Sequence, residues 1–391
     1  MADLTRVTGL KEKHRVRADL ISKDRLKKYL EDQIRRELKP AGIRAEELSL
    51  KKLGLVPLDF DLARTTVELM TEQAAAFYDY RKKTLFLLEG TTTDTPEEQQ
   101  TVLTHELAHA LADQHFNLNK YLHKSKNDDS SIARMAVMEG QATWLMYEIQ
   151  AEKIGQSLTT TPAIVDMMSR SADRKSDQYP VLNNTPLYMR ASLLFPYMQG
   201  LRFQNAVQQK LGNQGFREVF SRPPANSQEI LHPEKYLSQA AVDTISLPKI
   251  VSDTKFKDLN GGTLGEFDHA VLIEQYVGKT DADSLAPHWA SGAFRLVESE
   301  KEPEKRTVLL YASKWDDLNH ARSMFGAYRK VLAGKWKKMN ITQETANMIA
   351  GEGDDGFFCT RLDGLRVTSI EGLRTFDEAM KSSEATSAEL R

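Results

Sequence analysis

Up to about Leu247, hydrophobic positions recur with a helical period over most of the chain. Three long segments carry this period: residues 95–116, about 130–155 and about 187–211. The first has a strong start signal, because Thr95 is a good N-cap residue, Pro96 suits the first helical position and Glu98 completes a capping box. Pro196 stands inside the third segment and predicts a kink, or a break between two helices.

The segments around these helices give weaker signals. Residues 22–42 read as an exposed helix that Pro40 ends, and a second helical stretch runs through Met70. Residues 74–90 predict two short strands around a polar turn at Asp79–Lys83. The remaining polar stretches predict loops or irregular structure: residues 117–129, 159–162, 171–186 and 221–236.

After about Leu247 the pattern changes to strands mixed with one helix. Four segments follow one another: strands at 292–300 and 306–313, an amphipathic helix at 315–334 and a hairpin at 355–372. This order predicts a small α+β domain at the C-terminus. Together with the helical part before it, the sequence predicts an α+β protein.

Composition narrows the class of protein. The 391 residues are 40% apolar and 28% charged, which is typical of a soluble globular protein and long enough for two domains. A net charge of −2 gives no electrostatic case for nucleic acid. We expect no membrane span, because no apolar run approaches about 18 residues. The N-terminus lacks a signal-peptide pattern, so we expect a cytoplasmic protein, or an exported one whose signal is missing from this chain.

The candidate chemistry lies in the first long helix, in the sequence HELAH at residues 105–109. His105 and His109 lie one turn apart, about 40° from each other around the helix, and Glu106 lies about 60° further round. Two imidazoles on one face can ligate zinc, and a glutamate beside them can take a proton from a metal-activated water. Cys359 is the one cysteine, which excludes a site made of several thiolates.

A zinc site needs a third protein ligand, and the sequence offers two. His115 has the spacing of the metzincin peptidases, HExxHxxGxxH, but Ala112 stands where that pattern has a glycine. If the helix continues, His115 lies about 9 Å along the axis from His109 and roughly 120° round, out of reach. Glu139, in the second long helix, is followed by Gly140, which permits two helices to approach closely, and its face is otherwise apolar. The residues favour Glu139, and His115 stays as the alternative.

Two further residues are candidates for supporting the ligands. Asp113 follows His109 by one turn on the same arc, and zinc-bound histidines usually donate their second N–H to a carboxylate or carbonyl. Thr143 follows Glu139 by one turn and could hydrogen-bond a ligand.

Five sequence segments together resemble a known class of enzyme: AFYDYRKKTLFL, THELAHALADQHF, VMEGQATW, PYMQG and PPANSQEILHPEKY. HExxH on one helix with Glu-Gly on the next resembles the gluzincin clan of zinc peptidases. Over roughly residues 50–240 the chain is similar to a mostly uncharacterised group of bacterial zinc metallopeptidases. The resemblance implies one Zn²⁺ per chain held by His105, His109 and Glu139, with Glu106 as general base. It also implies that the strand at Thr84–Leu88 is the cleft-edge strand that pairs with an extended substrate.

The resemblance implies a role for one more residue. PYMQG resembles the PYxxG helix of the gluzincin aminopeptidases, where the tyrosine stabilises the oxyanion, and this implies the same role for Tyr197. His232, in LHPEKY, is the second candidate for that role. Those aminopeptidases carry a GxMEN-type segment whose glutamate binds the substrate amine, and nothing like it precedes His105. Its absence favours an endopeptidase.

The resulting hypothesis is a zinc-dependent hydrolase of peptide or protein substrates, in three parts. Residues 1–55 would be an N-terminal helical segment packed on the core, 56–245 a mainly helical gluzincin-like catalytic domain, and 246–391 the small α+β domain. Two alternatives stay open. One is the metzincin-like site with His115; the other is a catalytically silent protein whose zinc stabilises the fold and whose C-terminal domain binds a partner.

Overall fold

The computed structural model describes residues 1–37, 40–90, 95–171, 179–300 and 305–389. The chain divides into two compact units: the first comprises residues 1–39, 61–185 and 189–240, the second 40–60, 186–188 and 241–391. The fold is α+β, as the sequence predicts. Within the described ranges, every helix is too short or too polar to cross a lipid bilayer.

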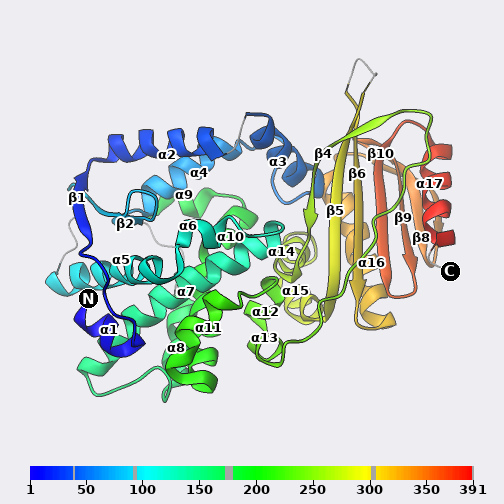
Figure 1. Cartoon of the computed structure of the whole chain (residues 1–391). Coiled ribbons are helices and arrows are strands. Elements are labelled where there is room, and N and C mark those ends of the chain that lie inside the picture. The colour runs from blue at the N-terminus through cyan, green and yellow to red at the C-terminus, as the bar shows by residue number, and fades with distance from the viewer. Residues whose placement is uncertain (38–39, 91–94, 172–178, 301–304, 390–391) are drawn as a thin grey trace. The chain divides into compact units, whose positions relative to one another are not determined.

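The first unit is mainly helical and contains a small sheet (Figure 1). Its elements are α1 (Ala2–Thr8), β1 (Arg17–Ile21), α2 (Lys23–Glu37), α4 (Leu62–Gln73), β2 (Ala76–Asp79), β3 (Thr84–Leu88), α5 (Pro96–Phe116), α6 (Leu118–Leu122), α7 (Asp128–Lys153), α8 (Pro162–Ser171), α9 (Pro180–Asn184), α10 (Leu187–Leu211), a 3-10 turn (Gly212–Gln214), α11 (Gly215–Ser221), α12 (Ser227–Leu231) and α13 (Pro233–Ser238).

The second unit is built on a large antiparallel sheet. Its elements are α3 (Pro40–Leu53), β4 (Phe256–Thr263), α14 (Glu266–Tyr276), α15 (Lys279–Leu285), a 3-10 turn (Ala286–His288), β5 (Trp289–Ser299), β6 (Thr307–Trp315), α16 (Leu318–Lys335), β7 (Met339–Thr345), β8 (Met348–Gly353), β9 (Gly356–Asp363), β10 (Arg366–Leu373) and α17 (Phe376–Glu389).

The three long helices of the first unit form where the sequence predicts them. At the start of α5 the Thr95 hydroxyl accepts the Glu98 N–H, and the Glu98 carboxylate accepts the Thr95 N–H, so the predicted capping box is present. Asn117, in the left-handed conformation, ends α5. α10 is one helix that contains Pro196, so the predicted break into two helices is wrong.

Other predictions around these helices were incomplete. Pro40 was expected to end a helix, but it begins α3, because proline fits the first turn of a helix as well as the stretch after one. α2 is exposed on one face only, since Leu26 and Leu30 are buried. The stretches expected to be loops or irregular contain the short helices α6, α9, α12 and α13, and α8 lies between two of these stretches. Residues 38–39, 91–94 and 172–178, which fall within predicted segments, lie outside the described residues.

The sheet of the first unit has the order β1-β3-β2, with β3 parallel to β1 and antiparallel to β2. One face packs on α2 and α4 through an apolar cluster that includes Ile21, Leu26, Val67 and Phe86. The prediction that Thr84–Leu88 is the edge strand is wrong, because β3 pairs with a strand on each side. The edge strand beside α5 is β2.

The core of the first unit joins α5, α7 and α10. Ala108 and Leu111 of α5 pack with Ala142 and Leu145 of α7 and with Leu201 of α10. The two helices α7 and α10 cross with their backbones in contact. A Cβ atom on Gly140 would lie 2.2 Å from the Gly200 carbonyl carbon, and one on Gly200 would lie 2.2 Å from the Ala136 oxygen. The close approach expected at Gly140 therefore exists.

The sheet of the second unit has the order β4-β5-β6-β10-β9-β8-β7. Neighbouring residues of β10 show how it is covered, because they point to opposite faces. Ile370 belongs to the apolar cluster that includes Ala379 of α17, whereas Glu371 accepts a hydrogen bond of 2.7 Å from Tyr328 of α16. α16 and α17 therefore cover opposite faces. The hairpin expected at 355–372 consists of β9 and β10.

Residues 40–60 group with the second unit, whereas the sequence places 1–55 together on the catalytic domain. The contacts give the reason. The Tyr276 hydroxyl donates to the Gly54 carbonyl at 2.7 Å, and the Asn260 amide donates to the Ser49 hydroxyl at 3.0 Å. Leucines of α3 gave no sign of which unit would bury them.

The crossing of α7 and α10 predicts the effect of adding one methyl group. We expect Gly140→Ala to lower the free energy of unfolding by about 1–3 kcal/mol, because the backbones must separate. Gly326→Ala is the matched control: Gly326 lies within α16 and its Cβ would meet no atom within 4 Å. That change should raise stability by about 0.5–1 kcal/mol through helix propensity. Equilibrium urea unfolding followed by circular dichroism measures both, and equal effects would contradict the crossing.

Candidate metal centre

Helix α5 places two imidazoles on the side of the helix that faces α7. His105 and His109 are one turn apart, and their Nε2 atoms lie 3.0 Å from each other. Their rings are nearly perpendicular, with an interplanar angle of 84° and centroids 4.7 Å apart. Because the lone pair of an imidazole nitrogen lies in the ring plane, perpendicular rings can direct both lone pairs at one point.

Helix α7 supplies the third donor. The Glu139 Oε2 atom lies 3.2 Å from Nε2 of His105 and 3.2 Å from Nε2 of His109. The side chains of His109 and Glu139 are each 9% exposed, and that of His105 is 12% exposed. The structure thus brings together three residues that the sequence singled out, from two helices, in one buried cluster.

The spacing of these donors fits a small cation. Zinc takes histidine nitrogen and carboxylate oxygen at about 2.0–2.2 Å, and tetrahedral geometry then separates the donors by about 3.3 Å. The observed separations are 3.0–3.2 Å. A buried carboxylate is stable only with positive charge or proton donors beside it. Two histidines and one glutamate are a donor set that zinc takes in hydrolases.

The charge state of Glu139 agrees with a ligand role. Burial alone would raise its pKa, but His109 and His105 outweigh burial and lower the pKa below the ordinary glutamate value. Glu139 is therefore ionised at neutral pH and presents a negative oxygen to the two imidazoles.

Glu106 lies beside the three donors with its carboxylate buried and fixed on one side. Its Oε2 accepts a 2.7 Å hydrogen bond from the backbone N–H of Tyr78 in β2. Burial raises the pKa of Glu106 to about 7; His105 and the Tyr78 N–H oppose this, and the charge of Glu139 adds to it. A carboxylate with a pKa near neutrality can both accept and release a proton at physiological pH.

Tyr197 of α10 lies over His105. The two rings stack with centroids 6.0 Å apart and an angle of 24°, and Tyr197 is 38% exposed. The charge of Glu139, followed by burial and the charge of Glu106, raises the pKa of Tyr197 well above 10. The hydroxyl therefore keeps its proton and can donate a hydrogen bond. The Gly140–Gly200 crossing sets this position, since Tyr197 precedes Gly200 by almost one helical turn.

The structure does not bring His115 to the cluster. α5 continues to Phe116 with Ala112 in helical conformation, and the His115 Nε2 lies 2.8 Å from the carbonyl oxygen of Lys11. His115 thus binds the N-terminal segment. The alternative that uses it as third ligand has no support in the geometry.

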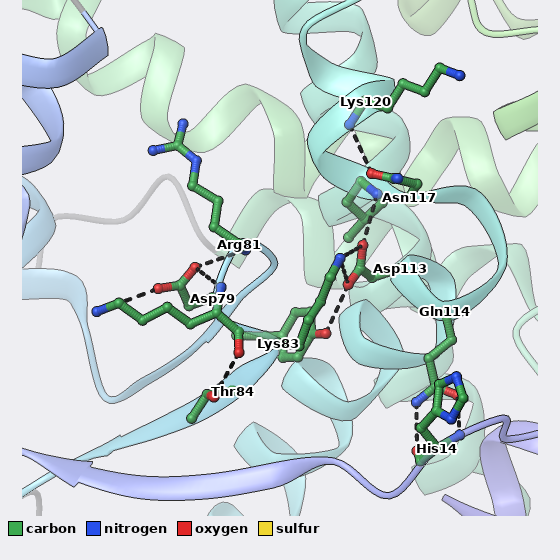
Figure 2. Close-up of polar contacts among 12 residues, drawn as sticks. His14, Asp79, Arg81, Lys83, Thr84, Asp113, Gln114, Asn117 and Lys120 are labelled. Carbon is green, nitrogen blue, oxygen red and sulfur yellow. Dashed lines mark hydrogen bonds and ion pairs between the residues drawn. The ribbon is translucent and has the colours of Figure 1, made fainter.

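Two predicted supporting residues contact other partners. Asp113 was expected beside a histidine, but its oxygens accept hydrogen bonds from Tyr78, Leu118 and Lys83. Figure 2 shows Asp113 with Lys83. Asp113 comes seven residues after Glu106 and lies about 20° from it around α5, so it shares the face of Glu106 that β2 contacts. The hydroxyl of Thr143 is buried and finds no hydrogen-bond partner among the described residues, so it supports no ligand in this conformation.

His232 lies at the junction of α12 and α13, where it ends one helix and begins the next. Its Nδ1 is 3.6 Å from Glu234 Oε1, and its side chain is 26% exposed. It is not one of the three clustered donors. It occupies the N-cap position of α13 before Pro233, where its side chain makes no capping hydrogen bond.

A second group of possible ligands lies in the second unit, at His288, Asp316 and His320. Its geometry differs from that of the first. The two rings are stacked almost in parallel, 3.5 Å apart at 14°, and each Nδ1 lies 2.6–2.7 Å from a different oxygen of Asp316. Parallel rings cannot direct their in-plane lone pairs at one ion. We therefore assign hydrogen bonds, and no metal, to this group.

Tyr78 contacts the site through Glu106, and Lys83 contacts Asp113; neither contact was predicted. A signal was present in the sequence, since neighbouring residues of a strand face opposite ways. Phe77 packs against the apolar cluster under the sheet, so Tyr78 must face away from that cluster, toward α5.

Comparison of the chain with protein-family models, with curated proteins and with solved structures gives no match. The case for a function therefore rests on the geometry of the site and the chemistry of its residues.

Proposed function

We propose that the protein is a zinc-dependent peptide hydrolase. The observation that carries the proposal is the convergence of His105, His109 and Glu139 on one point, with the carboxylate of Glu106 beside them. A scaffold that used zinc only for stability would have no need of a base with a raised pKa next to the ligands.

The residues divide the reaction as follows. A zinc ion held by the three donors would act as a Lewis acid on a water molecule and on the scissile carbonyl. Glu106 takes a proton from the water molecule while the water oxygen attacks the carbonyl carbon. The same residue then gives that proton to the amide nitrogen as the C–N bond breaks. The Tyr197 hydroxyl donates a hydrogen bond to the oxygen that becomes negative.

Substrate binding is best explained by strand β2. Its register pairs it with β3 on one side, and on the other side its Tyr78 N–H reaches Glu106. Because Glu106 takes the Tyr78 N–H, an extended peptide would pair with the other outward groups of this edge, and it would then run past the base and the three donors. Binding of this kind holds internal peptide bonds, so we propose an endopeptidase.

Glu106→Gln tests the role of the base. We expect the variant to retain one zinc per chain and to lose cleavage of an unfolded protein such as casein by at least about 100-fold, because glutamine cannot take the proton. Glu97→Gln is the matched control, since Glu97 is an exposed residue in the first turn of the same helix. Zinc content by mass spectrometry and casein cleavage by gel assay measure both. Wild-type protein that binds zinc but cleaves no peptide would instead support the catalytically silent alternative.

Tyr197→Phe tests the oxyanion role. Loss of one hydrogen-bond donor to an oxyanion lowers turnover on the order of 100-fold, and we expect that loss with unchanged zinc content. Tyr179→Phe, at another partly exposed tyrosine of the same unit, should leave turnover unchanged. If Tyr197→Phe retains full turnover, the role passes to His232, and His232→Ala should then show the loss.

A further inference from the structure

Tyr78 connects two carboxylates of α5. Its backbone N–H donates to Glu106 Oε2 at 2.7 Å, and its hydroxyl donates to Asp113 Oδ2 at 2.8 Å. Glu106 and Asp113 are seven residues apart, which is two turns or about 10 Å along the helix. One residue of the edge strand is thus attached to α5 at both its backbone and the end of its side chain.

Asp113 is the fixed end of this connection. Its side chain is 1% exposed, and both oxygens are used. Besides Tyr78, Oδ1 accepts the Leu118 N–H at 2.9 Å, and the Lys83 ammonium lies 2.6 Å from Oδ2 and 2.9 Å from Oδ1. Figure 2 shows the Lys83 side chain extending from the hairpin turn to Asp113. The carboxylate therefore binds the strand, the turn and the start of α6 together.

The turn that carries Lys83 is itself held in one conformation. Asp79 Oδ1 accepts the backbone N–H groups of Arg81 at 2.9 Å and Lys82 at 3.0 Å (Figure 2). Lys83 has a φ of 53°, a left-handed conformation that is unfavourable for a residue other than glycine. Such a conformation persists where the surroundings enforce it. Here the ion pair with Asp113 stabilises the conformation in which the Lys83 side chain points toward α5.

We propose that Asp113, acting through Tyr78 and Lys83, is a positioning residue for the general base Glu106. The proposal rests on the proposed function. A base needs one oxygen directed at the proton it takes, and a hydrogen bond to the other oxygen fixes the carboxylate. Among the described residues, the Tyr78 N–H is the one donor that fixes the Glu106 carboxylate in this way. This donor belongs to β2, an edge strand with no second described strand to hold it in place. The contacts with Asp113 hold that strand at the distance this hydrogen bond requires.

The first experiment separates positioning from binding. We expect Tyr78→Phe and Asp113→Asn to lower kcat by about 10- to 100-fold with KM changed less than about threefold, and to keep one zinc per chain. Lys83→Ala should act in the same direction, and Lys83→Arg should recover much of the loss. Lys82→Ala is the matched control, because Lys82 adjoins Lys83 in the turn and lies 3.8 Å from Asp79 instead. Full kcat in both Tyr78→Phe and Asp113→Asn would overturn the proposal.

A double variant tests whether the two residues act through their shared hydrogen bond. If they do, Tyr78→Phe with Asp113→Asn should lower kcat no more than the stronger single change. If the two losses of kcat multiply in the double variant, the residues act separately, and this would contradict the connection from Asp113 through Tyr78 to Glu106.

A measurement that needs no catalysis separates this inference from the proposed function. Hydrogen exchange at the Tyr78 amide should be slow in the wild-type protein and at least about tenfold faster in Tyr78→Phe, Asp113→Asn and Glu106→Ala. Amides of β3 should change little. Unchanged exchange at residue 78 in Asp113→Asn overturns the inference even if the protein is a peptidase. Absence of peptide cleavage by the wild type overturns the proposed function, and faster exchange at residue 78 would then still establish the link from Asp113 to Glu106.

Discussion

The backbone contact between α7 and α10 is the constraint on which the candidate site depends. With glycine at positions 140 and 200, the two helices approach so closely that a single methyl group on either glycine would overlap the backbone of the other helix. Glu139 precedes one of these glycines and Tyr197 lies almost one turn before the other. The crossing therefore places the Glu139 carboxylate and the Tyr197 ring beside the histidines of α5, from segments that are far apart in sequence.

A second constraint acts on a neighbouring face of α5, the face that carries Glu106 and Asp113. There the edge strand β2 contacts the helix through Tyr78, whose N–H fixes one oxygen of Glu106. Glu106 and Glu139 then differ in charge state for a physical reason. Burial raises the pKa of Glu106 to about 7, whereas the two histidines overcome burial at Glu139 and keep it ionised. Two buried glutamates in one cluster thus suit different tasks, proton transfer and ligation.

The sequence predicted the parts of the site whose signals are local. The spacing of HELAH predicted which residues share a face of α5, and the capping box predicted where that helix starts. Gly140 predicted the close approach of two helices, which are α7 and α10. Contacts between distant elements could not be predicted in the same way. β1 pairs in parallel with β3, which leaves β2 at the edge beside α5. The residues of β1 are mostly exposed, so they show no hydrophobic alternation by which the sequence could have identified this strand. Asp113 has the spacing of a partner for His109, yet Tyr78 and Lys83 reach it first. Residues 40–60 pack on strands that lie more than 200 positions later.

The central claim is that His105, His109 and Glu139 hold one catalytic zinc ion. Anomalous diffraction at the zinc edge, from crystals of the zinc-loaded protein, tests it most directly, with zinc content measured in Glu139→Ala and His115→Ala. We expect one anomalous peak within about 2.2 Å of the two Nε2 atoms and the Glu139 carboxylate. We also expect loss of zinc in Glu139→Ala and one zinc per chain in His115→Ala. A peak at His115 or at His288 and His320, or stoichiometric zinc in Glu139→Ala, would contradict it.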